Sequence, residues 1–386
     1  MPAQRIGLYL HVPFCQAKCA YCDFASVAGR ADLYAPYAAA VAAELRCRPG
    51  LPPNAAGREF QAETIYIGGG TPSILPLDLL QSIFAEILAQ FAPPAGAEMT
   101  LEVNPGTVDA PALAALRRLG VNRLSVGVQS FDDAELRRLG RIHDRTRAIE
   151  TLRAARQAGF DNLNLDLIFG LPAQTLADWR ANLDAALERR PDHISLYALT
   201  LEEGTPLAAR VAAGALPAPD DDLAAEMYVL AEERLAQAGF EHYEISNWAQ
   251  PGRQAQHNVN TWRNGDYLGF GPAAHSHLGR RRWWNARQPE AYIAAMQAGR
   301  SPVAGEEDLD LATDMGETMM LGLRLLQEGV EVERFRARYG RTPAQVYGAA
   351  LDELAGLGLI EVQPERVRLT PRGRLLGNRV FARFLP

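Results

Sequence analysis

The sequence is poor in cysteine and contains no long apolar run. Four cysteines occur among 386 residues, which is not the composition of a disulfide-stabilised secreted domain. No stretch reaches the ~18 apolar residues that a transmembrane helix needs. The residues after Met1 also lack the small-residue cleavage site of a signal peptide. We therefore expect a cytoplasmic protein.

A basic excess is also missing. The formal net charge is -7 at pH 7, whereas proteins that bind nucleic acids usually carry a basic domain or stripe. The sequence therefore argues against a nucleic-acid partner. Hydrophobic residues make up 48% and charged residues 22% of the chain, a balance typical of a globular protein rather than a disordered one.

The first two thirds of the chain alternate short aliphatic runs with Ala-, Leu- and Arg-rich helical stretches. This alternation is typical of parallel βα units. Six strands are predicted, at residues 5–12, 63–68, 99–103, 123–128, 162–169 and 193–198. Function in such a sheet is expected at the C-terminal strand ends. The predicted fold is therefore α/β, a partial (β/α)6 barrel open on one side.

The remainder of the chain shows a different pattern. Three parts are predicted: a barrel at 1–240, a loop-rich connecting segment at 241–288, and a mainly helical C-terminal part at 289–386. The last part ends in two short strands, expected at 360–363 and 366–369. Helices followed by a small hairpin resemble a winged helix.

Three of the four cysteines form a compact motif directly after the first predicted strand. Cys15, Cys19 and Cys22 have the spacing CxxxCxxC, which would leave one iron of a 4Fe-4S cluster without a protein ligand. Clusters that only transfer electrons usually take four cysteines, whereas an open iron can bind a small molecule. A zinc knuckle completed by His11 is the alternative, although this spacing suits zinc poorly. Cys47 is interpreted as a packing residue.

The CxxxCxxC spacing resembles that of the radical S-adenosylmethionine (SAM) superfamily, and further motifs match it between residues 7 and 262. A glycine run follows the second strand, where the backbone can approach a ligand closely. By resemblance, Gly69, Gly70 and Thr71 hold the amino group of SAM, whose amine and carboxylate chelate the open iron. Glu102, at the end of the third strand, could pair with the ammonium group.

Further along the chain, three motifs match the subgroup built around oxygen-independent coproporphyrinogen dehydrogenase. The resemblance assigns Arg141 to the methionine carboxylate, Gln129 and Asp166 to the ribose, and Tyr9 to the neighbourhood of the cluster. Asp166 lies between apolar residues on a predicted buried strand. Because a buried carboxylate is costly, Asp166 has either a ligand-binding task or an Arg or Lys partner.

Two features depart from the dehydrogenase pattern and match the heme chaperone HemW family instead. Phe24 stands where the dehydrogenases carry a fourth cysteine, and the chain begins almost at the first strand. Residues 257–262 read HNVNTW, close to the HNxxYW signature of that family, with Thr261 in place of the tyrosine. His257 is therefore a predicted heme ligand, expected near solvent and beside Trp262.

The resemblance implies a protein that binds heme and passes it to an acceptor protein, including a membrane-bound one. The 4Fe-4S cluster with exchangeable SAM would have a structural, regulatory or reductive role, served by an electron donor protein. The alternative is a coproporphyrinogen dehydrogenase, a radical enzyme that decarboxylates propionate side chains. A purely structural iron-sulfur protein is a third hypothesis.

Overall fold

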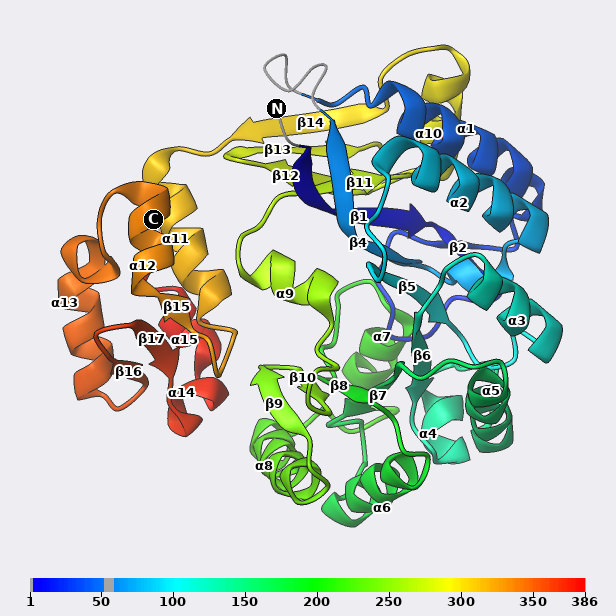
Figure 1. Ribbon diagram of the computed structural model, residues 1–386. Coiled ribbons are helices and arrows are strands. Elements are labelled where there is room, and N and C mark those ends of the chain that lie inside the picture. The colour runs from blue at the N-terminus through cyan, green and yellow to red at the C-terminus, as the bar shows by residue number, and fades with distance from the viewer. Residues whose placement is uncertain (1–2, 52–58, 386) are drawn as a thin grey trace.

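A twelve-stranded sheet with helices on its outer face organises the computed structural model, which describes residues 3–51 and 59–385 (Figure 1). The strand order is β14-β13-β12-β11-β1-β4-β5-β6-β7-β8-β10-β9. The six predicted strands are all present and parallel: β1 (Gln4–Val12), β4 (Phe60–Gly69), β5 (Glu98–Val103), β6 (Arg123–Gln129), β7 (Leu163–Phe169) and β8 (His193–Ala198). The predicted α/β fold with an open partial barrel is confirmed.

Helices cover the outer face of these strands. They are α1 (Tyr34–Cys47), α2 (Leu77–Phe91), α3 (Ala110–Arg118), α4 (Asp133–Arg138), α5 (Arg145–Gln157), α6 (Leu176–Glu188) and α8 (Asp221–Gln237). The short helix α7 (Pro206–Ala212) lies elsewhere, beside Ala20, whose carbonyl accepts a hydrogen bond from the amide of Leu207 at 2.8 Å. Several begin at a side chain that caps the first turn, such as Asp144 before α5 and Thr175 before α6. Cys47 is exposed at the end of α1, so its interpretation as a packing residue is wrong.

Each barrel strand has one apolar and one polar face. Leu8, Ile65 and Leu124 belong to the core between the sheet and the helices. Residues one position away, such as Thr64 and Arg123, face the barrel interior, because successive side chains of a strand point to opposite faces. The helices therefore pack on an apolar surface, and the interior of the barrel remains polar.

A short helix and short strands occupy much of the stretch 241–288, where loops were expected. It contains β9 (Glu241–Glu244), β10 (Asn247–Ala249), α9 (Gln256–Trp262), β11 (Tyr267–Phe270), β12 (His275–Leu278) and β13 (Arg281–Asn285), and β14 (Val303–Asp308) follows after α10 (Pro289–Gln297). The expectation of a loop-rich segment is wrong. Its strands are too short to give a clear sequence pattern, and β11 is ordered by parallel pairing with β1, the first strand of the chain. The division of the chain at 240 and 288 stays a prediction.

The C-terminal part has its own apolar core and forms a separate lobe, orange and red in Figure 1. Its elements are α11 (Leu311–Gly322), β15 (Val330–Glu331), α12 (Val332–Tyr339), α13 (Pro343–Gly356), β16 (Ile360–Val362), β17 (Arg366–Leu369), α14 (Pro371–Leu375) and α15 (Gly377–Phe381). Strands β16 and β17 form the predicted antiparallel hairpin, and β15 adds a third strand.

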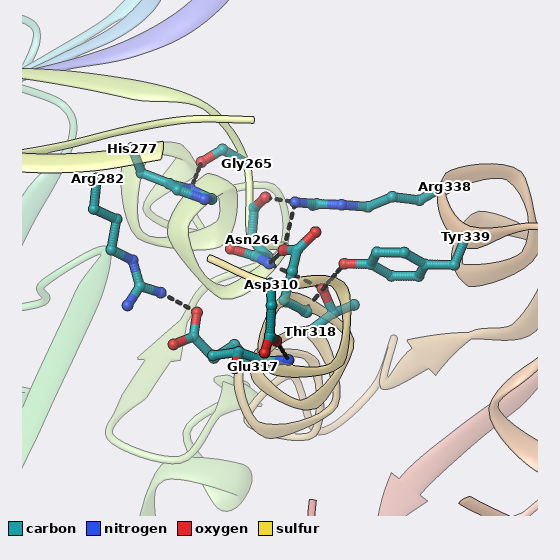
Figure 2. Close-up of polar contacts among 11 residues, drawn as sticks. Asn264, Gly265, His277, Arg282, Asp310, Glu317, Thr318, Arg338 and Tyr339 are labelled. Atoms are coloured by element: carbon teal, nitrogen blue, oxygen red, sulfur yellow. Dashed lines mark hydrogen bonds and ion pairs between the residues drawn. The ribbon is translucent and has the colours of Figure 1, made fainter. Parts of the chain in front are cut away.

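Polar contacts of α11 join this lobe to Asn264, which precedes β11, and to Arg282 of β13 (Figure 2). The buried carboxylate of Asp314 accepts hydrogen bonds from Arg338 and from the amide of Asn264, each at 2.9 Å. Arg282 of β13 forms an ion pair with Glu317. Among residues 3–51 and 59–385, no helix is both long and apolar enough to cross a membrane.

Candidate functional site

A pocket of about 340 Å³ opens at the C-terminal ends of the barrel strands. Its lining includes ten of the twelve predicted site residues: Cys15, Cys19, Cys22, Gly69, Gly70, Thr71, Glu102, Gln129, Arg141 and Asp166. These residues come from the cysteine loop and from four different strands or the loops after them. The open sheet therefore gathers side chains that are up to about 150 positions apart in the sequence.

Cys15 ends β2 (Phe14–Cys15), Cys19 and Cys22 lie in the loop that leads from it to β3 (Val27–Ala28), and all three thiols are free. The hydroxyl of Thr71 donates to the sulfur of Cys15 at 3.6 Å, and the guanidinium of Arg141 donates to the sulfur of Cys19 at 3.2 Å. Burial raises the pKa of Cys22, and the neighbouring thiols raise it further. Thiolates on this loop therefore need nearby positive charge, which metal ions supply.

The donor geometry fits a cluster better than a single ion. Among the described residues, no three His, Cys, Asp or Glu side chains meet closely enough to hold one metal ion. Both ring nitrogens of His11 are already engaged, with the Tyr9 hydroxyl and the carbonyl of Ala25, each at 2.9 Å. The zinc knuckle completed by His11 is therefore not formed. A four-iron cluster is larger, so each thiolate can bind a different corner.

The glycine run follows β4 and lies against the cysteine loop. Gly69 has φ +114°, a conformation that favours glycine. A Cβ on Gly70 would lie 2.5 Å from the carbonyl oxygen of Phe14, so only glycine fits there. The amides of Gly70 and Thr71 donate to the carbonyls of Val12 and Phe14 at 2.8 and 2.7 Å. The glycines thus bring backbone groups directly beside the loop that carries Cys15.

Glu102 presents its carboxylate to the pocket. It accepts hydrogen bonds from the hydroxyl of Tyr66 at 2.8 Å and from the amide of Gly69 at 3.0 Å. Burial raises its pKa to about 7, and the charge of Asp166 contributes in the same direction. A cationic ligand group in the pocket would favour the ionised carboxylate.

Arg141 is a half-buried cation at the pocket wall. Its guanidinium donates to the amide oxygen of Asn104 at 2.6 Å and to the carbonyl of Gly127 at 2.8 Å. Its buried Nε atom has no hydrogen-bond partner, and among the described residues no carboxylate forms an ion pair with it. A guanidinium of this kind suits an anionic ligand group such as a carboxylate.

Gln129 and Asp166 complete the pocket wall. Gln129 has φ +68° at an irregularity between β6 and β7, a conformation that costs a non-glycine residue energy and is typical of functional sites. Asp166 accepts hydrogen bonds from Ser125 at 3.0 Å and Asn164 at 2.8 Å, and burial raises its pKa. Among the described residues, no Arg or Lys forms an ion pair with Asp166. The ion pair that was the alternative to a ligand-binding task is therefore not formed.

Tyr9 and His257 are absent from the pocket lining. His257 is only 7% exposed, its Nδ1 atom lies 2.9 Å from the hydroxyl of Thr64, and burial lowers its pKa to about 4. The expectation that His257 lies near solvent is wrong. Trp262 points to another side, because five residues turn a helix by a net angle of about 140°. Its ring lies 4.3 Å from the guanidinium carbon of Arg324 instead.

Several pocket residues were not predicted, among them Tyr66, Asn104, Ser125 and Tyr197. Tyr66 and Ser125 lie two positions before Gly68 and Gly127 of their strands, Asn104 lies two positions after Glu102, and Tyr197 lies two positions after Ser195 of β8. The period of two that relates side chains on one face of a strand could have identified them.

Comparisons with known proteins agree with this geometry. Residues 9–186 match the family model of the Radical SAM superfamily, and residues 309–376 match that of the HemN C-terminal domain. The heme chaperone HemW of Mycobacterium tuberculosis is 38% identical, covering 100% of this chain and 96% of its own. The heme chaperone HemW of Bacillus subtilis is 35% identical, with 98% of each chain covered.

A solved structure is similar over the whole chain. The coproporphyrinogen III oxidase HemN of Escherichia coli, described as a radical SAM enzyme, has a TM-score of 0.84 and 25% identity, covering 100% of this chain and 91% of its own. The resemblance predicted from the motifs is confirmed. With identities well above 30% over nearly complete relatives, the chain belongs to the HemW family of the radical SAM superfamily.

Proposed function

We propose that this protein binds heme and transfers it to an acceptor protein, and that it carries a 4Fe-4S cluster with exchangeable SAM. The observation that carries the proposal is the match to heme chaperones named HemW over essentially the whole chain, at 35 to 38% identity. Phe24 supports it, because this residue stands where the dehydrogenases carry a fourth cysteine. Phe24 lines the pocket and is 61% exposed.

The pocket provides the groups that the cluster and SAM require. Cys15, Cys19 and Cys22 would hold three irons. Glu102, with the backbone of the glycine run, would bind the ammonium group of SAM, and Arg141 would bind its carboxylate. When bound, the cluster and SAM supply one-electron chemistry, and the protein supplies orientation and exclusion of water.

The remaining wall residues would bind the nucleoside part of SAM. Gln129 and Asp166 offer an amide and a carboxylate to ribose hydroxyls, and Asp166 is already oriented by Ser125. Tyr9 lies beneath the cysteine loop, since its hydroxyl contacts His11, whose ring reaches the carbonyl of Ala25. It would therefore support the cluster loop rather than contact SAM.

The partners belong to the same proposal. An electron donor protein would reduce the cluster, and a heme-acceptor protein would receive heme, with both encounters in the cytoplasm. The acidic net charge of -7 argues against nucleic acid as a partner. The assignment of His257 to heme iron stays a prediction, and it would require the imidazole to leave Thr64 and become accessible.

The second candidate function is oxygen-independent coproporphyrinogen dehydrogenase activity. The observation that favours it is the TM-score of 0.84 to the HemN enzyme, together with a pocket lined by most of the residues predicted to bind SAM. The exposed Phe24 in place of a cysteine counts against it.

One anaerobic experiment separates the two functions. The full chain, reconstituted with iron and sulfide, is incubated with SAM and reductant and given either heme or coproporphyrinogen. A Soret band that co-purifies with the protein, and that moves to an acceptor protein once this is added, supports the heme chaperone. Formation of protoporphyrinogen supports the enzyme. Absence of heme uptake by wild type rejects the proposal. Cys19→Ser is the matched control, expected to lose the cluster and SAM binding together.

A further inference from the structure

His257 belongs to a series of contacts that leads to the pocket. Its Nδ1 atom lies 2.9 Å from the Thr64 hydroxyl, and its ring lies 5.3 Å from that of Tyr66, inclined by 30°. Thr64 and Tyr66 are two positions apart on β4, so both side chains point into the barrel. His257 therefore supports β4 from inside, on the side away from the C-terminal strand ends.

Tyr66 connects this support to Glu102. Its hydroxyl donates to one oxygen of the Glu102 carboxylate at 2.8 Å, while the amide of Gly69 donates to the other at 3.0 Å. A Cβ on Gly68 would lie 2.8 Å from Cε1 of Tyr66 and 2.9 Å from the carboxyl carbon of Glu102. The absence of a side chain there lets Tyr66 and Glu102 meet, so the position of the Tyr66 ring sets the direction of the carboxylate.

The helix that carries His257 is held in place for this contact. Glu98, the first residue of β5, accepts hydrogen bonds from the backbone amides of Gln256 and His257 at 2.9 and 3.0 Å. A Cβ on Gly7 would lie 3.2 Å from Cε1 of His257, so glycine leaves room for the imidazole. Strand β5 thus fixes α9 at its first residue and carries Glu102 four positions later.

We propose that His257 is a positioning residue of the SAM site, which acts through Tyr66 to fix the Glu102 carboxylate that pairs with the ammonium group of SAM. The inference rests on the proposed SAM site and does not involve heme. This role accounts for the burial of His257 and for the fact that its side chain and that of Trp262 point to different sides of α9. A neutral imidazole that bonds Thr64 and packs on Tyr66 is suited to orient neighbouring groups rather than to bind an incoming ligand.

The test is a SAM titration of the reduced, cluster-loaded full chain, followed by the change in the electron paramagnetic resonance signal of the cluster. His257→Ala and Tyr66→Phe should each raise the Kd for SAM about tenfold, because each leaves Glu102 less constrained. Since both act through the same contacts, the double variant should stay near tenfold rather than approach about a hundredfold. Thr64→Val removes only the hydrogen bond to His257 and should raise Kd roughly threefold.

His277→Ala is the matched control, because this histidine is 3% exposed on β12 and lies outside the pocket. Its Kd for SAM should equal that of wild type. If Glu102→Gln weakens SAM binding while His257→Ala and Thr64→Val do not, the inference fails and the SAM site stands. If Glu102→Gln has no effect, the site assignment itself fails. A double variant with multiplied effects also overturns the inference.

Two further readouts keep the outcomes separate. Should His257→Ala fail to hold the cluster, Thr64→Val alone decides the question, because a wild-type Kd in that variant excludes the role of His257. Heme uptake by wild type is measured on the same preparation. Its failure would count against the heme chaperone proposal and would leave the SAM result unaffected.

Discussion

Replacement of Glu102 by glutamine should stabilise the protein without ligand and weaken SAM binding. Burial raises the pKa of Glu102 from 4.5 to about 7 in the folded protein, so the folded state must give up its proton at higher pH than the unfolded state does. At about 1.4 kcal/mol for each pKa unit, ionisation of Glu102 costs up to about 3 kcal/mol of stability above pH 7. This is an upper value, since the carboxylate faces the pocket. Glutamine can keep both neighbours, with its oxygen accepting from Gly69 and its amide donating to Tyr66.

The sign of the effect is set by the direction of the pKa change. A raised carboxyl pKa gives stability that is fully present below the unfolded value of about 4.5 and is lost as pH rises to about 7. The free energy of unfolding of cluster-free protein, measured in urea at pH 8.5, should therefore be higher for Glu102→Gln by about 2 to 3 kcal/mol. At pH 4.5 the two proteins should be equal. A difference that does not change with pH, or destabilisation at pH 8.5, would refute the reasoning.

Glu232→Gln provides a contrast of opposite sign. Burial alone would raise the pKa of Glu232, but hydrogen bonds from His242 and Arg374 lower it below its usual value. A lowered carboxyl pKa gives stability that is present above the unfolded value and is lost as pH falls through the folded value. Glu232→Gln should therefore destabilise the protein at pH 8.5, and the loss should shrink as the urea experiment is repeated toward pH 4. Equal slopes for the two variants would contradict both assignments.

Two structural substitutions have defined outcomes as well. Gly70→Ala places a Cβ 2.5 Å from the carbonyl oxygen of Phe14, so the cysteine loop must shift, and iron retained after reconstitution should fall while the far-ultraviolet circular dichroism stays unchanged. Full iron retention would show that the loop can move. Asp314→Ala removes a buried carboxylate that accepts from the exposed Arg338 and from the buried amide of Asn264, and it should lower the free energy of unfolding in urea by about 1 to 3 kcal/mol. A loss below about 1 kcal/mol would mean that water replaces the carboxylate.

The parallel strands could be predicted because their signal is local. Strands such as β6 and β7 combine apolar residues at alternate positions with a following helix, so sequence windows identify them. The strands β11 to β13 contain four or five residues each, and His, Arg and Trp make up much of β12 and β13. They are ordered by a neighbour far away in sequence, since Leu8 of β1 pairs with Leu268 of β11. No local pattern contains that information.

The pocket could be predicted because parallel strands place their C-terminal ends at one edge. Cysteine spacing identified Cys15, Cys19 and Cys22, and residues at strand ends such as Glu102 and Gln129 line the same cavity. The location of His257 could not be predicted in this way. Whether a short helix presents a histidine to solvent or to the barrel depends on its anchor, and here the anchor is Glu98, about 160 positions earlier in the chain.

The polar interior of the barrel explains why the pocket and the buried histidine are connected. Arg123 is one of the inward side chains, is 2% exposed and donates a hydrogen bond to Thr100. Its charge lowers the pKa of both Glu102 and Asp166, although the opposite effect of burial is larger. An interior of this kind is costly unless its groups are mutually oriented. Because each inward residue is held by others, a change at His257 reaches Glu102 by way of Tyr66. A barrel filled with aliphatic side chains would be more stable, but it could not orient two carboxylates and a guanidinium toward a ligand that carries both charges.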